Sequence, residues 1–143
     1  MAHSVRYHLS PVRLQAKPIF SISNGVLERV FCQDPLVEET LRNNGVTDDA
    51  LRETELAILR NAGSTIAGTG GLKKIRCHSR DRGKSGSVRI ISADYPHAGR
   101  TYMLAAFGKD EKDNLSRGEC RALFKLKRDL DAAVEKWVSH DNS

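Results

Sequence analysis

The chain has 143 residues, a length that fits one domain with a buried core. Its net charge is +5 at pH 7. The window from Gly71 to Ile90 holds seven Lys and Arg residues against Asp81 alone, a net +6, so the rest of the chain sums to −1. The basicity is therefore a local patch, which is typical of a surface that binds nucleic acid or phosphate. A solvated basic loop is the alternative explanation.

Cysteine usage excludes a disulfide framework, because Cys32, Cys77 and Cys120 stand far apart and form no CxxC pair. It favours reduced thiols in a cytoplasmic protein. Cys77 and His78 would point to opposite faces of a strand, so we expect a structural cysteine beside a surface histidine and no metal site. No apolar run is long enough to cross a membrane, and no signal peptide is evident.

The N-terminal stretch, residues 1–25, shows no clear apolar period and reads as a poorly ordered tail with a short strand near Ile19–Ile22. The domain proper is predicted to be 26–143, beginning with a short strand around Val30–Cys32.

Two helices are predicted next. Asp34 followed by Pro35 indicates the start of a helix that ends near Gly45. Thr47 is placed to cap a second helix, which we expect Gly63 to end. Its apolar face is formed by Leu51, Leu56, Ile58 and Leu59.

After Gly71 the apolar period changes to two, which predicts strands. One strand places Lys74 and Arg76 on one face, and the next strand places Arg89 on the corresponding face. The opposite face carries Ile75, Cys77, Val88 and Ile90. Antiparallel pairing would therefore gather the three cations on an exposed surface suited to phosphate.

A third strand, residues 100–107, precedes a capping box at Ser116 and Glu119 that opens a long helix. Its buried stripe is predicted to be Leu123, Leu126, Leu130, Ala133, Val134 and Trp137. The order β-α-α-β-β-β-α predicts an α+β domain, an antiparallel sheet with helices packed on one side.

Two stretches carry a family resemblance: GTGGLKKIRCHSRDRGKSGSVRII, from Gly68, and MLAAFGKDEKDNLSRGECRALFKL, from Met103. Their order and spacing closely resemble the RelE/ParE superfamily of bacterial toxins, and its HigB-like branch in particular. The similarity runs from about Thr47 to Leu126 and extends more weakly back to about Val26.

The resemblance implies a small ribonuclease fold with an N-terminal helical hairpin, an antiparallel sheet and a C-terminal helix. It implies a toxin that cleaves mRNA on the translating ribosome without metal or other cofactor, by attack of a 2′-OH on the adjacent phosphate. Catalytic basic residues are then expected at Lys74, Arg76, Arg89 and Lys109. We expect RNA contacts from Lys73, Arg80, Arg82, Lys84 and Lys112. The expected partners are a helix-turn-helix antitoxin, the ribosome and mRNA.

The sequence departs from the family in its aromatic residues, because none flanks Arg89 to stack on bases. We expect Phe124 and Trp137 to belong to the core, which leaves Tyr95, His97 and Tyr102 as candidates for stacking. Weak or strictly ribosome-dependent cleavage would follow. Two alternatives stay open: a ParE-like DNA gyrase poison, and a degenerate module that binds RNA or an antitoxin without chemistry.

Overall fold

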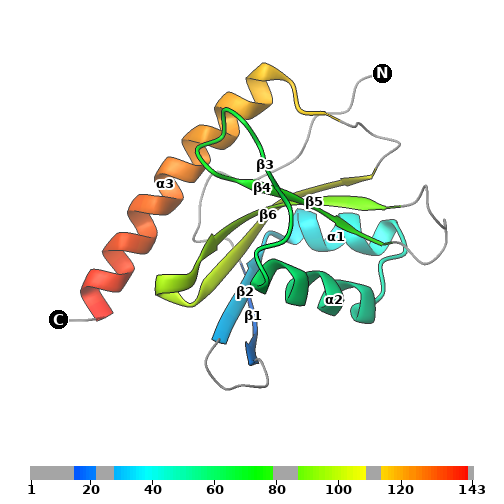
Figure 1. Cartoon of the computed structure of the whole chain (residues 1–143), viewed down its shortest axis with the longest axis horizontal. Coiled ribbons are helices and arrows are strands. Elements are labelled where there is room, and N and C mark those ends of the chain that lie inside the picture. Colours follow the sequence, from blue (N-terminus) through cyan, green and yellow to red (C-terminus); the bar gives the residue numbers. More distant parts are fainter. Residues whose placement is uncertain (1–14, 22–27, 79–86, 109–113, 142–143) are drawn as a thin grey trace.

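The computed structural model describes residues 15–21, 28–78, 87–108 and 114–141 (Figure 1). Its elements follow the predicted order, with a further strand before the first and a two-residue strand after the second helix. They are β1 (Gln15–Ser21), β2 (Glu28–Gln33), α1 (Pro35–Asn43), α2 (Asp48–Leu59), β3 (Ser64–Thr65), β4 (Lys73–Cys77), β5 (Val88–Tyr95), a 3-10 turn (Pro96–Ala98), β6 (Arg100–Gly108) and α3 (Arg117–Asp141). The α+β class is confirmed.

The described strands form one sheet in the order β1-β2-β6-β5-β4-β3. The consecutive strands β4, β5 and β6 pair antiparallel, as predicted. β2 pairs parallel with β6. After both helices the chain returns to the sheet, where β4 runs in the direction of β2, and the two antiparallel pairings that follow restore this direction in β6. The strand expected near Ile19 is present as β1, which pairs antiparallel with β2. The domain boundary at residue 26 stays a prediction.

Helices cover both faces of the sheet, so the prediction that they pack on one side is wrong (Figure 1). α1 and α2 cover the face that carries Ile75 and Ile90. α3 covers the other face through contacts with Ile91 and Phe107. The physical reason is that β5 and β6 are buried along nearly their whole length, so both of their faces are apolar and both require a cover.

The predicted helix starts are confirmed by side-chain caps. Asp34 accepts a hydrogen bond from the Leu36 amide at 2.7 Å, and Thr47 accepts one from the Ala50 amide at 3.1 Å. Ser116 and Glu119 exchange side-chain and backbone bonds of 2.8 and 3.1 Å, which is a complete capping box. The predicted end of α2 at Gly63 is wrong, because α2 already ends at Leu59 and Asn61 takes the left-handed conformation, with φ 63°.

The buried stripe of α3 consists of Leu123, Leu126, Leu130 and Val134, as predicted. Ala133 is exposed, and Trp137 and Phe124 are each 41% exposed, so their assignment to the core is wrong. The guanidinium of Arg100 lies over the ring of Trp137, 4.1 Å from its centroid, a cation–π contact that gives this partly exposed side chain a partner on β6.

The GTGG stretch before β4 is a structural turn that packs under α3. Gly68, Gly70 and Gly71 all have positive φ, of 79°, 77° and 111°. Thr69 is fully buried between them, and its hydroxyl donates to the Ile66 carbonyl at 2.7 Å and accepts from the Leu72 amide at 3.2 Å. The turn therefore fixes where β4 begins.

We predict that Gly70→Ala destabilises the protein by about 1–2 kcal/mol, since φ 77° disfavours a Cβ. The new methyl would also lie 3.2 Å from Cδ1 of Phe124 on α3. Thermal melting followed by circular dichroism measures the effect. The matched control is Gly118→Ala in the first turn of α3, where the nearest atom is 3.9 Å away and melting should be unchanged or higher. Equal melting temperatures for the two variants would contradict this account of the turn.

Candidate functional site

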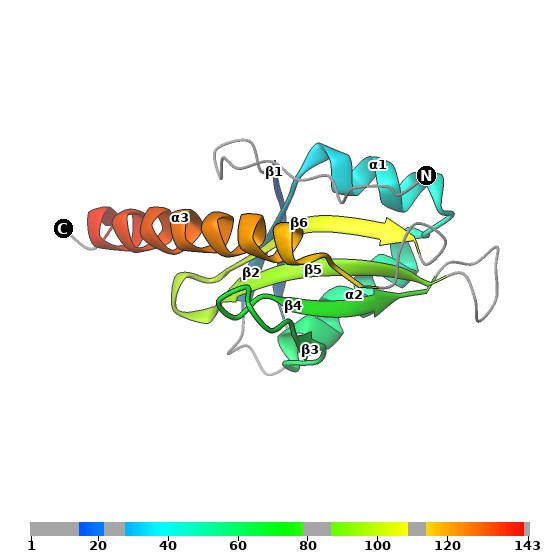
Figure 2. The same cartoon turned by 90° about the horizontal axis from the view of Figure 1, so that it is seen from above.

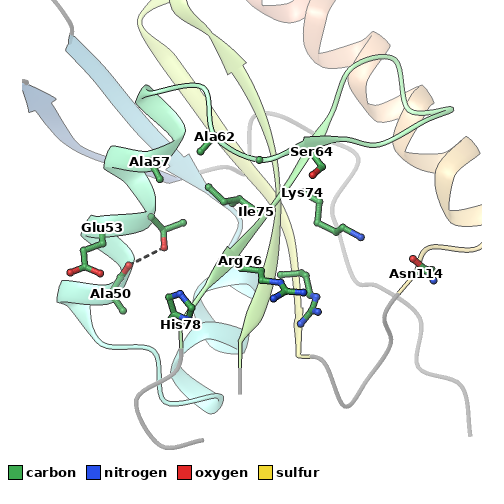
Figure 3. Close-up of a pocket in the computed structure, with 13 residues that line it drawn as sticks. Ala50, Glu53, Ala57, Ala62, Ser64, Lys74, Ile75, Arg76, His78 and Asn114 are labelled. Carbon is green, nitrogen blue, oxygen red and sulfur yellow. Dashed lines mark hydrogen bonds between the residues drawn. The ribbon is translucent and has the colours of Figure 1, made fainter. Parts of the chain in front are cut away.

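A groove of about 830 Å³ lies between α2 and the edge strand β4 and continues onto the face that α3 partly covers (Figure 3). β3 pairs only with Lys73 and Lys74, so among the described residues the rest of β4 is an outer edge of the sheet. The polar side chains that line the groove are Glu53, Thr54, Ser64, Lys74, Arg76, His78, Arg89 and Asn114.

Strand register brings together three of the four predicted catalytic cations. Arg76 lies directly opposite Arg89 across the β4–β5 ladder, and Lys74 is two residues along the same strand. Since side chains two apart share a face, all three are on one side of the sheet. Lys74 is partly exposed and Arg76 is exposed, and both extend from β4 toward the side where Asn114 lies (Figure 3).

Arg89 has the predicted face but not the predicted exposure, because only 6% of the residue is accessible. β5 is an inner strand, and Arg89 is flanked by Arg76 on β4 and by Phe107 on β6. One of its guanidinium nitrogens, Nη1, donates to the Ser87 carbonyl at 3.4 Å. The surrounding strands restrict the orientation of this guanidinium, and Arg89 still lines the groove. It can therefore act as a fixed hydrogen-bond donor to a bound anion.

Of the predicted RNA contacts, Lys73 is the one that falls among the described residues, and it does not line the groove. Lys73 donates from Nζ to the side-chain and backbone oxygens of Asn61 and lines a separate small cavity with it. As the neighbour of Lys74 in β4, it points to the opposite face. The remaining predicted residues, Arg80, Arg82, Lys84, Lys109 and Lys112, lie outside the described residues.

The electrostatics of the groove favour anions. The described lining includes Lys74, Arg76 and Arg89 and a single carboxylate, Glu53, which sums to +2 with His78 counted as neutral. The Thr54 hydroxyl already donates to the Ala50 carbonyl at 2.9 Å, the contact drawn in Figure 3. A groove of this charge can bind a phosphate backbone and neutralise negative charge that develops on it.

The pair Cys77 and His78 has the expected structural arrangement. Cys77 is fully buried in the core under α2, and its Sγ lies 3.8 Å from the Ala50 carbonyl oxygen. Burial raises the pKa of its thiol, so the thiolate that metals and electrophiles require is disfavoured. His78 is exposed and lines the groove. In the described part of the chain, no cluster of three or more His, Cys, Asp or Glu side chains could hold a metal ion.

The expected stacking candidates do not reach the groove. Tyr95 and Tyr102 are each only 6% exposed, and their rings contact each other edge-on in the core under α3. The Tyr95 hydroxyl donates to Asp131 at 2.5 Å, and burial followed by this hydrogen bond raises the pKa of Tyr95. His97 is exposed but bonds to Glu135 at 2.9 Å. Tyr95 and Tyr102 therefore support the hydrophobic core, and the idea that they stack on bases is wrong.

Sequence reasoning missed five polar residues of the groove: Glu53, Thr54, Ser64, His78 and Asn114. His78 was expected at the surface but not in the site. Glu53 and Thr54 lie on the flank of α2 that faces β4. With Ala50 and Ala57 they follow an i, i+3, i+4, i+7 spacing, which could have indicated one shared face of the helix. Ser64 and Asn114 come from connecting segments, whose positions relative to the sheet have no periodic signal.

The family described as the RelE toxin of the RelE/RelB toxin–antitoxin system matches this chain over residues 28–140. The match runs from the first residue of β2 into the last turn of α3. The matched region includes every described residue of the groove. Across the ranges that the structure describes, none of the helices combines the length and apolar character that a membrane span requires.

Cys77 should be unreactive toward alkylating reagents, although its neighbours Arg76 and His78 both line the groove. We predict that iodoacetamide alkylates Cys77 in the native protein roughly tenfold or more slowly than the partly exposed Cys120, because burial blocks access and disfavours the thiolate. Peptide mapping by mass spectrometry over a pH series measures both rates, and Cys77 should gain reactivity only above the usual thiol range. Equal rates in denaturant provide the control, and fast native labelling of Cys77 would contradict the buried placement.

Proposed function

We propose that this chain, which belongs to the RelE toxin family, is a ribosome-dependent endoribonuclease of the HigB-like branch that cleaves mRNA and so arrests translation and growth. It is the toxin of a toxin–antitoxin system, and we propose that its antitoxin is a helix-turn-helix protein. The observation that supports the nuclease most directly is the cross-strand pair of Arg76 and Arg89, joined by Lys74 on one face of the groove.

The proposed reaction uses a nucleophile that RNA itself supplies. The 2′-oxygen attacks the adjacent phosphorus and loses its proton, a 2′,3′-cyclic phosphate forms, and the bond to the 5′-oxygen breaks as that oxygen takes up a proton. The protein must hold the backbone in line and neutralise the extra negative charge of the phosphorane. Cations suffice for these two tasks. Whether Lys74 or Lys109 also moves a proton stays open.

The groove cations can divide this work by their exposure. The enclosed guanidinium of Arg89 loses little freedom when it meets a phosphate, so it suits the developing charge of the transition state. Arg76 is exposed and can follow the backbone on either side of the scissile bond. Lys74, half covered and two residues away, can contact the neighbouring phosphate.

Dependence on the ribosome follows from what the described part of the groove lacks. None of its lining residues is Phe, Tyr or Trp, and His78 is its one ring among the described residues, whereas proteins that bind single strands alone use aromatic platforms worth about 1–3 kcal/mol per base. A groove that carries positive charge but no described Phe, Tyr or Trp side chain binds the phosphate backbone of RNA without fixing the positions of its bases. The ribosome holds mRNA in a defined path and can supply that positioning.

We predict that Arg89→Gln lowers the rate of mRNA cleavage by roughly 10²–10³, the usual effect of losing one donor aimed at the transition state. Glutamine is chosen because Arg89 is buried and alanine would leave a cavity. Growth after induction, primer extension on a reporter message and thermal melting are measured on the same variant. Growth should recover while the fold is retained.

The matched control is Arg42→Gln, which removes an exposed arginine from α1 on the other face of the sheet. It should remain as toxic as the unmodified chain. Undiminished cleavage by Arg89→Gln, or its unfolding, would remove Arg89 from the proposed active site. DNA breaks with intact messages would instead identify a gyrase poison.

A further inference from the structure

A second basic surface lies on α3, outside the groove. Four exposed cations recur at four- and three-residue intervals, which places them on the side of the helix opposite the buried leucines. They span about 16 Å at 1.5 Å per residue. We call this surface the α3 basic stripe, and its members are Arg117, Arg121, Lys125 and Arg128.

The distribution of charge along α3 is the reverse of what helix stability favours. Residues 117–128 hold five cations and one acid, a net +4, and residues 129–141 hold one cation and four acids, a net −3. The helix macrodipole prefers acids near the N-terminus and cations near the C-terminus. Successive cations four residues apart also repel by about 0.2–0.5 kcal/mol per pair. Stability of the helix therefore does not explain the stripe.

The stripe has little internal compensation. Lys127, on the same helix, forms an ion pair with Asp131 at 2.6 Å. Its ammonium group also makes a cation–π contact with Tyr95, 5.3 Å from the ring centroid. Arg117, Arg121 and Lys125 form no ion pair with any residue that the structure describes. Three cations in a row are thus presented to solvent.

The stripe begins close to the groove. Asn114, a groove residue, stands three positions before the start of α3. α3 then runs along the sheet, and its N-terminal half lies beside the turn that precedes β4 (Figure 2). Phe124 and Lys127 both approach Gly70 of that turn, within 3.2 and 3.6 Å of where a Cβ would stand. One extended anion could therefore meet both surfaces.

We propose that the α3 basic stripe is a second RNA-binding surface, which binds the phosphate backbone of double-helical RNA while the groove holds the single strand to be cut. This inference rests on the proposed function and adds the docking element to it. A helix is a rigid straight rod, so its cations form a fixed row. A duplex backbone offers a matching fixed row of phosphates, and duplex RNA is recognised mainly by shape and backbone contacts.

Charge and apolar area decide between RNA and a protein partner. The cores of protein interfaces are enriched in Arg, but they combine it with buried aromatic residues and Met, and they are depleted in Lys. The one partly exposed aromatic residue among the stripe cations is Phe124. Its ring already contacts the turn at Gly70, and the guanidinium carbon of Arg128 lies 6.0 Å from the ring centroid. The surface is therefore better suited to phosphate than to an apolar anchor.

The test compares two double variants that each remove two exposed cations, Arg121→Gln/Lys125→Gln on the stripe and Arg42→Gln/Arg60→Gln at the C-terminal ends of α1 and α2. Fluorescence anisotropy with a labelled 20-base-pair RNA duplex, without ribosomes, measures affinity at several salt concentrations. The stripe variant should bind roughly tenfold or more weakly. Its slope of log affinity against log salt should fall by about two, one for each lost phosphate contact. The control pair should match the unmodified protein, and melting should be similar for all.

Two outcomes overturn the proposal: equal salt slopes for the two double variants, or a stripe variant that binds duplex RNA normally but no longer binds the purified antitoxin. The second outcome would make the stripe a protein interface. Both differ from failure of the proposed function, which is read from primer extension on the unmodified chain. If that chain arrests growth while messages stay intact, the nuclease assignment fails whatever the stripe binds.

Discussion

The antiparallel register between β4 and β5 is the constraint on which the rest of the structure depends. Ile75 lies opposite Ile90 in the core under α1 and α2, and the same register sets Arg76 opposite Arg89 on the other face. A slip of one residue would turn the arginines into that core and the isoleucines out of it. Apolar burial under the helices therefore holds two like charges side by side, an arrangement that two arginines would not adopt without it.

α3 completes this arrangement by covering one face of the sheet unevenly. Its leucines bury the part of that face around Ile91 and Phe107, while Lys74 and Arg76 stay accessible in the groove. The GTGG turn sets the distance between α3 and β4, because Gly70 lets Phe124 approach closely. The helix that closes the core is thus also the element that places a row of cations next to the groove.

Much of this followed from local pattern. Alternation in β4 predicted which cations share a face, and capping residues such as Asp34 and Thr47 predicted where helices begin. The presence of helices on both faces of the sheet could not be predicted, because the continuously apolar sequence of a strand such as β6 does not indicate which element covers each face. The burial of Arg89 did not follow either, since alternation gives the face of a residue and not its depth in the sheet. Trp137 was misassigned because helical spacing cannot foresee its partner, Arg100, on another element.

The molecule therefore carries two concentrations of like charge that its own fold does not require, one across a strand pair and one along a helix. In each case apolar burial on the far side of the element offsets the repulsion, through Ile75 and Ile90 beneath the groove and Leu123 and Leu126 beneath the stripe. An anion that binds the native state and not the unfolded chain relieves that repulsion and stabilises the fold by mass action.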